Sequence, residues 1–275
     1  MTSTPTTRKH GRTLILFDVD GTLAVPAQPA AAEMIAALAK LREQYATGIV
    51  GAGDFEKQQM QLGGPDLRER LDFCFSENGV HSFRGPGNCL HSKSLESHLG
   101  PERWQAFNTK LDELLLVHRD EAATLLVQAS PGADIATRGT FLERRQCTVN
   151  VCVIGRTPGL SKEERGAFDT VDREAGLRRR LLEQLTAAFG PETEFGLLFS
   201  IGGQIGIDCC LVGWDKTFCL QFVDAAEFDT VHFFGDKTQP GGGDYELYEH
   251  ERTIGHTVVS PEDTLEQIAK LFPSE

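Results

Sequence analysis

The sequence predicts an α/β protein in which a parallel-sheet core is interrupted by an inserted α+β domain. Three observations support this prediction. Apolar, β-rich runs alternate with helical patterns at the start of the chain; this rhythm changes after "GPGN" (85–88); and it returns after "GWDK" (213–216). Alternating strands and helices are typical of parallel sheets. The outer segments, 12–89 and 213–275, should therefore form one domain, and 90–212 should be the insertion.

The first outer segment has a β-α-β-α-β pattern. "TLILFDV" (13–19) is typical of a buried parallel strand, and "AAAEMIAALAKLREQ" places Met34, Ile35, Leu38 and Leu41 on one helix face. Two further strands, "TGIVGAG" and "FCFSENG", flank the helix "DFEKQQMQLG". The polar residues 1–11 contain no apolar signal segment and are interpreted as a disordered leader.

The insertion combines helices with antiparallel strands. "SLESHLGPERWQAFNTKLDELLLV" and "KEERGAFDTVDREAGLRRRLLEQLTAAFG" have helical patterns. Between them, "GTFLERRQ" and "CTVNVCVIG" alternate and follow one another closely, which predicts a hairpin, and "QIGIDCCLVG" predicts another strand. "LRRRLL" (177–182) is interpreted as an ordinary solvated helix face.

The last segment returns to the core. "TVHFFGD" (230–236) predicts a buried strand that ends in an aspartate, and "HTVVSPEDTLEQIAKLF" predicts a strand and a closing helix. The helix has a start signal at Ser260 to Asp263.

Composition excludes several classes of partner. The net charge of −13 over 275 residues disfavours nucleic acid and anionic membrane as partners. No apolar run approaches the ~18 residues of a membrane helix. The seven cysteines are odd in number and contain no C-x-x-C motif, which predicts reduced thiols and a cytoplasmic location. The adjacent Cys209 and Cys210 are expected to fill the core, although a redox pair is the alternative.

Four aspartates are candidates for one site. Asp18 and Asp20 follow the first strand, Asp236 ends a later strand, and Asp244 follows in a glycine-rich loop. Carboxylates that converge at strand ends repel one another unless a cation lies among them, and oxygen ligands suit Mg²⁺. One carboxylate could then attack phosphorus while the second moves a proton, with Lys216 neutralising phosphoryl charge. The alternative is that these aspartates form turns and helix caps.

The motifs "LFDVDGTL", "FSENG", "RGTFLE", "KEER", "GWDK", "FFGDKT" and "PEDT" resemble the eukaryotic phosphomannomutases, within the haloacid dehalogenase superfamily. The resemblance covers residues 12–275. It implies a Rossmann-like core with an inserted cap, and a Mg²⁺-dependent exchange of mannose 6-phosphate and mannose 1-phosphate that supplies GDP-mannose synthesis. It further implies priming by a hexose 1,6-bisphosphate and a homodimer formed through the cap.

The resemblance also implies roles for individual residues. Asp18 would be the phosphorylated nucleophile and a metal ligand, and Asp20 the acid/base with its carbonyl on the metal. Asp236 would complete the ligands, with support from Asp244. The carbonyls of Tyr248, His250 and Thr253 would bind a second cation. Substrate ligands would be Lys216 and, in the cap, Arg145, Arg156, Arg165 and Asp208. Arginine suits the phosphate that is not reacting because its guanidinium binds phosphate in a fork; otherwise these arginines pair with Glu143, Glu163 and Glu164 or face solvent.

Four positions depart from the family pattern. Ala27 stands where the family has a substrate-binding arginine, Gly53 and Gly206 where it has serines, and Gly243 where it has an asparagine. Losing a donor aimed at transition-state charge can cost ~10²–10³ in rate. The sequence therefore leaves open a slow mutase, a silent sugar-phosphate-binding or interaction protein, and a sugar-phosphate phosphatase, of which the mutase is the prediction.

Overall fold

The computed structural model describes residues 8–145 and 147–273. Contacts divide the chain into two compact units: residues 1–92 with 213–275, called the core unit, and residues 93–212, called the cap unit. The predicted insertion began at residue 90, but the strand at Cys89–Ser92 belongs to the sheet of the core unit. The boundary therefore lies after this strand.

The core unit contains a seven-stranded sheet with the order β11-β10-β1-β2-β3-β4-β5. Its strands are β1 (His10–Phe17), β2 (Tyr45–Val50), β3 (Phe73–Ser76), β4 (His81–Arg84), β5 (Cys89–Ser92), β10 (Thr230–Gly235) and β11 (Ile254–Thr257). The five strands from β11 to β3 are parallel, as predicted, whereas β4 and β5 extend the edge antiparallel. "GPGN" is the tight turn between these two short strands, which the sequence analysis missed.

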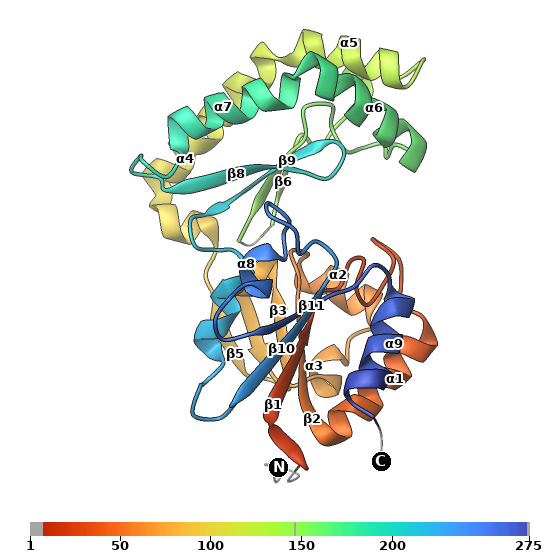
Figure 1. Ribbon diagram of the computed structural model, residues 1–275. Helices are drawn as coiled ribbons and strands as arrows, with labels where there is room; N and C mark the ends of the chain where they lie inside the picture. Colours follow the sequence, from red (N-terminus) through yellow and green to blue (C-terminus); the bar gives the residue numbers. More distant parts are fainter. Residues whose placement is uncertain (1–7, 146, 274–275) are drawn as a thin grey trace. The chain divides into compact units, whose positions relative to one another are not determined.

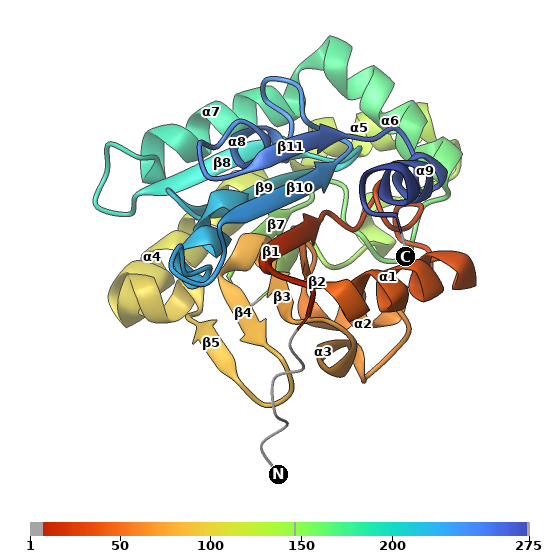
Figure 2. The same ribbon diagram turned by 60° about the horizontal axis from the view of Figure 1, so that its bottom comes forward.

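Alternation along β1 sends apolar side chains to both faces of this sheet. Ile15 and Phe17 pack with Met34 and Leu38 of α1 (Ala32–Gln44), whereas Leu14 and Leu16 pack against the opposite face. Figure 2 shows α1 and α9 (Pro261–Leu271) together on the first face. The remaining elements are α2 (Phe55–Gln61), α3 (Leu67–Arg70), α8 (Tyr245–Tyr248) and the 3₁₀ segments η1 (Glu77–Gly79) and η3 (Lys216–Phe222).

The predicted leader is wrong for the residues that the structure describes. Residues 1–7 lie outside the described range, but Arg8 donates two hydrogen bonds to Asp72, at 2.9 and 2.8 Å. His10 begins β1 and stacks on Tyr45 with ring centroids 4.8 Å apart. These contacts order a polar segment that has no apolar signal of its own.

The cap unit is a four-stranded antiparallel sheet of order β6-β7-β9-β8 with helices packed on it (Figure 1). Its strands are β6 (Leu142–Arg144), β7 (Val149–Val151), β8 (Leu197–Gly202) and β9 (Gly206–Leu211). Its helices are α4 (Leu95–Val117), α5 (Arg119–Ala129), α6 (Lys162–Ala175) and α7 (Leu177–Phe189), with a 3₁₀ turn η2 (Ile135–Thr137). The β6–β7 hairpin was predicted; α5 and β8 were not.

The interpretation of "LRRRLL" as a solvated face is wrong for its first arginine. Gly176, at φ +74°, separates α6 from α7 and turns Arg178 inward, where its side chain is 1% exposed. Its guanidinium bonds Asp172 at 2.6 Å and Asp169 at 2.5 Å, and reaches the Gly203 carbonyl at 3.3 Å. Arg179 and Arg180 are exposed, as predicted.

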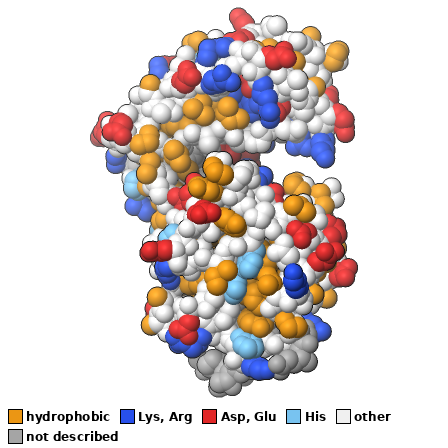
Figure 3. All heavy atoms as spheres, viewed as in Figure 1, with side chains coloured by type: hydrophobic (Ala, Val, Ile, Leu, Met, Phe, Trp, Pro, Cys, Tyr) orange, Lys and Arg blue, Asp and Glu red, His pale blue; other side chains and the backbone are white. Residues whose placement is uncertain are grey.

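Three features of the structure bear on the expectations drawn from composition: surface charge, membrane-spanning helices and cysteines. On the side drawn in Figure 3, Lys and Arg side chains of the cap unit stand among Asp and Glu side chains. Within residues 8–145 and 147–273, no helix has the length and apolar character needed to span a bilayer. No disulfide joins the cysteines among the described residues. Cys209 is buried, as a core-filling residue should be, whereas Cys210 is half-buried.

Candidate active site

The two predicted catalytic aspartates lie at the carboxyl end of the central strand β1. The Asp18 amide donates to the Phe234 carbonyl of β10 at 2.8 Å, so Asp18 and Asp236 leave adjacent parallel strands at the same edge. Gly21 makes this approach possible. It has φ +94°, and a Cβ there would lie 2.5 Å from an Asp236 carboxylate oxygen. The glycine of "DVDGT" is therefore required by both conformation and space.

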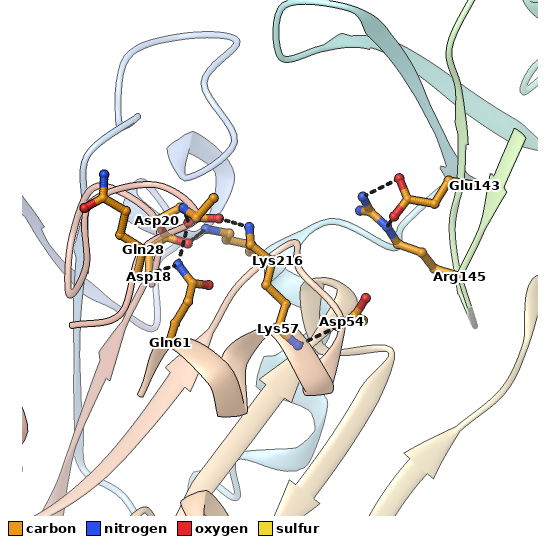
Figure 4. Close-up of polar contacts among 10 residues, drawn as sticks. Asp18, Asp20, Gln28, Asp54, Lys57, Gln61, Glu143, Arg145 and Lys216 are labelled. Atoms are coloured by element: carbon orange, nitrogen blue, oxygen red, sulfur yellow. Dashed lines mark hydrogen bonds and ion pairs between the residues drawn. The ribbon is translucent and has the colours of Figure 1, made fainter. Parts of the chain in front are cut away.

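Three of the predicted carboxylates converge. Asp18, Asp236 and Asp244 each offer an oxygen, and these oxygens lie within 4.8 Å of one another. Lys216, from the first turn of η3, donates to Asp18 (Figure 4). It also donates to Asp244 at 2.5 Å. The side chains of Lys216, Asp18 and Asp244 are 6%, 8% and 2% exposed, so the ion pairs are shielded from water.

This burial sets the protonation of the cluster. Burial raises the pKa of Asp18 to about 6; Lys216 opposes the rise, and Asp244 and Asp236 add to it. Burial also raises the pKa of Asp236. For Lys216, burial lowers the pKa, but Asp18 and Asp244 together hold it above its ordinary value. The lysine thus remains charged, whereas burial disfavours the ionised forms of Asp18 and Asp236.

The donor set fits a divalent cation. One carboxylate oxygen of Asp236, Oδ1, is buried and accepts no hydrogen bond in the described structure. A buried carboxylate oxygen without a partner is costly unless a cation or water satisfies it. The three carboxylates offer only oxygen atoms, which suits Mg²⁺ rather than a softer metal. This cluster is the candidate metal site.

Asp20 lies beside the cluster in a different environment. Its Oδ1 accepts from the Ala27 amide at 2.9 Å and from Gln61 Nε2 at 2.8 Å, and its Oδ2 pairs with Lys57. Burial raises the pKa of Asp20, but these three donors outweigh burial and lower it. Sequence reasoning missed Lys57 and Gln61. The available signal was their i, i+4 spacing after Asp54, which caps α2 by accepting from the Lys57 amide at 2.7 Å.

In the cap unit, the predicted substrate ligands Arg145, Arg156 and Asp208 belong to one polar row. Glu143, Asn150 and Asp208 are direct cross-strand partners on β6, β7 and β9. Glu143 pairs with Arg145 at 3.4 Å (Figure 4). It also pairs with Arg156 at 3.0 Å. Asn150 accepts from Arg156 Nε at 3.1 Å and donates to Asp208 at 2.6 Å. The structure thus pairs Arg145 and Arg156 with Glu143, which the sequence analysis named as their alternative partner. Asn150 was missed because its pairing across the strands is a property of the sheet register.

Two groups of predicted ligands remain apart from these clusters. Arg165 is exposed at the start of α6, and no ion pair among the described residues joins it to the polar row. Tyr248, His250 and Thr253 follow one another around the end of α8. There the Thr253 amide donates to the His250 carbonyl at 2.9 Å, so that carbonyl already has one partner.

The four small residues differ in the space around them. A Cβ at Gly206 would lie 2.6 Å from Asn150 Nδ2, and one at Gly53 would lie 3.1 Å from Lys57 Cδ. A Cβ at Gly243 would contact nothing within 4 Å. Ala27 has φ +61°, in the left-handed region. A larger residue at Gly206 would therefore displace the asparagine that links Arg156 to Asp208, whereas Gly243 leaves open space.

Comparison with known proteins gives a consistent result. The family model described as eukaryotic phosphomannomutase matches residues 34–274. Phosphomannomutases of Schizosaccharomyces pombe and Saccharomyces cerevisiae are 41% and 43% identical over 267 and 266 residues, covering 96% of this chain and of each relative. Among solved structures, the trehalose-6-phosphate phosphatase C-terminal domain of C. albicans covers 94% of this chain and 92% of its own, at 14% identity and TM-score 0.59. A trehalose-6-phosphate phosphatase related protein covers 94% and 96%, at 17% identity and TM-score 0.55.

Proposed function

This chain belongs to the eukaryotic phosphomannomutase family, and on that premise we propose that it interconverts mannose 6-phosphate and mannose 1-phosphate through a phosphorylated aspartate. The observation that carries the proposal is the convergence of buried Asp18 and Asp244 with half-buried Asp236 at the edge of the core sheet, where Lys216 pairs with Asp18 and Asp244. The mannose 1-phosphate formed would supply GDP-mannose synthesis.

Asp18 is the proposed nucleophile. One of its carboxylate oxygens forms a bond to phosphorus, and the bond from phosphorus to the departing sugar oxygen breaks. Lys216 donates hydrogen bonds to both Asp18 and Asp244 and so orients the two carboxylates. Its positive charge offsets negative charge on the transferring phosphoryl group. Because the pKa of Asp18 is raised by burial, its ionised form depends on positive charge nearby.

Asp20 is the proposed acid and base. Its carboxyl group donates a proton to the departing sugar oxygen, and in the second half of the reaction its carboxylate takes a proton from the attacking hydroxyl. Gln61 and the Ala27 amide donate hydrogen bonds to Oδ1 of Asp20, and Lys57 pairs with Oδ2. These bonds fix the orientation of the carboxylate.

Mg²⁺ is the proposed cation, with Asp18, Asp236 and the Asp20 carbonyl as protein ligands and Asp244 in support. When bound, it supplies positive charge to the phosphoryl oxygens. The orphaned Asp236 oxygen supports this assignment. The carbonyls of Tyr248, His250 and Thr253 are proposed for a second cation. A hexose 1,6-bisphosphate is the proposed activator, because it can phosphorylate Asp18.

In the cap unit, Arg145, Arg156 and Arg165 are proposed to bind the phosphate that is not reacting, with Asp208 accepting from a sugar hydroxyl. The hydrogen-bonded row that contains Arg145, Arg156 and Asp208 supports this proposal. We also propose a homodimer formed through the cap and a cytoplasmic location. The odd number of cysteines without a C-x-x-C motif is compatible with that location.

The test is a two-product assay. The protein is incubated with Mg²⁺, mannose 1-phosphate and a catalytic amount of mannose 1,6-bisphosphate, and both hexose 6-phosphate and free phosphate are measured. Hexose 6-phosphate that disappears in Asp18→Asn is the expected result. Free phosphate alone would indicate a phosphatase. Neither product, with binding retained, would indicate a binding protein and refute the enzymatic proposal.

A further inference from the structure

The polar row of the cap unit contains its own anion. Glu143 lies on β6, and Arg145 follows the last residue of that strand, where its amide donates to the Thr148 carbonyl at 2.9 Å. The Glu143 carboxylate contacts Arg145 through two nitrogens, each at 3.4 Å, and Arg156 Nε at 3.0 Å. One carboxylate thus lies between the two arginines in the way that a phosphate would, with its oxygens facing guanidinium nitrogens.

Charge in this row is balanced before any ligand arrives. Glu143 and Asp208 are acidic, Arg145 and Arg156 are basic, and Asn150 joins Arg156 to Asp208. A phosphate that binds both arginines brings negative charge against the Glu143 carboxylate. The carboxylate and the phosphate therefore compete for the same donors, because each guanidinium has a limited number of N–H groups directed to that side.

We propose that Glu143 is an internal counter-ion that occupies the phosphate clamp of the cap and is displaced when a phosphate dianion binds. This inference rests on the proposed function of Arg145 and Arg156. It deepens that function by assigning Glu143 a role in specificity and release: the carboxylate weakens phosphate binding and competes for the arginines as the phosphate departs. A mutase benefits, because its bisphosphate intermediate must leave the clamp and bind again in the reverse orientation.

Half-burial makes the competition measurable. The side chains of Arg145, Arg156 and Glu143 are 24%, 29% and 34% exposed, so the charges are screened by water only in part. Removing one negative charge about 4 Å from a bound anion, even with the screening of bulk water, changes affinity by about fivefold. Because Glu143 and the two arginines are partly buried, the change in phosphate affinity should be larger than this estimate for bulk water.

The experiment measures the affinity of inorganic phosphate for the full chain by isothermal titration calorimetry, with EDTA present. Glu143→Gln keeps the size of the side chain and removes its charge, so we expect phosphate to bind at least about fivefold more tightly. The matched control is Glu121→Gln. Glu121 pairs with Arg180 at 2.5 Å with 40% exposure, so this variant loses the same charge elsewhere in the cap unit and should bind phosphate unchanged.

Steady-state kinetics supply a second readout. If Glu143 only supported the fold, its substitution would not lower KM and kcat together. Glu143→Gln should lower KM and also lower kcat, because release of the phosphate from the clamp slows. Weaker or unchanged phosphate binding in Glu143→Gln would overturn the proposal and indicate that Glu143 only orients the arginines. Arg156→Gln distinguishes failure of the proposed phosphate clamp from failure of the proposed counter-ion. Unchanged phosphate affinity in Arg156→Gln would refute the clamp. Weaker phosphate binding in Arg156→Gln, without tighter binding in Glu143→Gln, would refute only the counter-ion role of Glu143.

Discussion

Arg178 allows a sharp test of how burial decides the role of an arginine. The chain carries three successive arginines on α7, and the structure separates them: Arg178 is buried and bound to Asp172 and Asp169, whereas Arg179 and Arg180 are exposed. Arg178→Met keeps an unbranched side chain, shorter than that of arginine, and removes its charge and donors. Asp172, whose side chain is 4% exposed, would then hold a buried charge without a cation.

The expected cost follows from that geometry. Breaking a buried ion pair by removing one partner destabilises by about 3–5 kcal/mol, because the remaining charge is uncompensated. Arg179→Met, one residue along the same helix, should cost no more than about 0.5 kcal/mol. The double variant Arg178→Met with Asp172→Asn should cost less than the sum of the two single changes, because the stranded charge is removed.

Urea unfolding followed by Trp fluorescence measures these differences in the cap unit. The chain has two tryptophans; Trp104 lies in the cap unit and Trp214 in the core unit, so Trp214→Phe as a common background leaves Trp104 as the reporter. With a slope of about 1–3 kcal/mol/M, Arg178→Met should lower the midpoint by at least about 1 M. A midpoint within error of that of Arg179→Met would refute the reasoning.

The remaining predictions concern the core unit. Asp236→Asn should abolish the rise in melting temperature that Mg²⁺ gives the wild type and should lower turnover more than about 100-fold, since a bound cation supplies several kcal/mol to the transition state; an unchanged Mg²⁺ response would contradict the metal assignment. Gly21→Ala should destabilise by at least about 1–3 kcal/mol, because of its φ of +94° and the 2.5 Å approach to Asp236, whereas Gly243→Ala, whose Cβ would meet nothing within 4 Å, should be near neutral in urea melts. Burial, with the neighbouring His256, lowers the pKa of His232 to about 4. The unfolded chain therefore binds more protons than the folded chain between about pH 6.5 and 4, so stability should fall as pH falls through that window. His232→Gln should reduce the difference between the urea midpoints at pH 7 and pH 5, and an unchanged difference would argue against this role of His232.

The sequence by itself determined the parallel core and the positions of its chemistry. Apolar runs that end in Asp18 and Asp236 predict strands whose carboxyl ends share an edge, and the structure brings these residues together with Asp244 and Lys216. This was possible because the apolar runs and the short "DVDGT" turn are local patterns, and the alternation of strands with helices predicts that the strands are parallel.

Only the tertiary structure decided which polar side chains meet. The burial of Arg178 depends on the break at Gly176 and on two aspartates of the preceding helix, and no local pattern separates it from Arg179. The contacts that run from Glu143 through Arg156 and Asn150 to Asp208 depend on the register of β7 with β9, which lies far along the chain. Register and burial are set by the packing of the whole unit, so side-chain partners of this kind follow from the fold and not from spacing along the sequence.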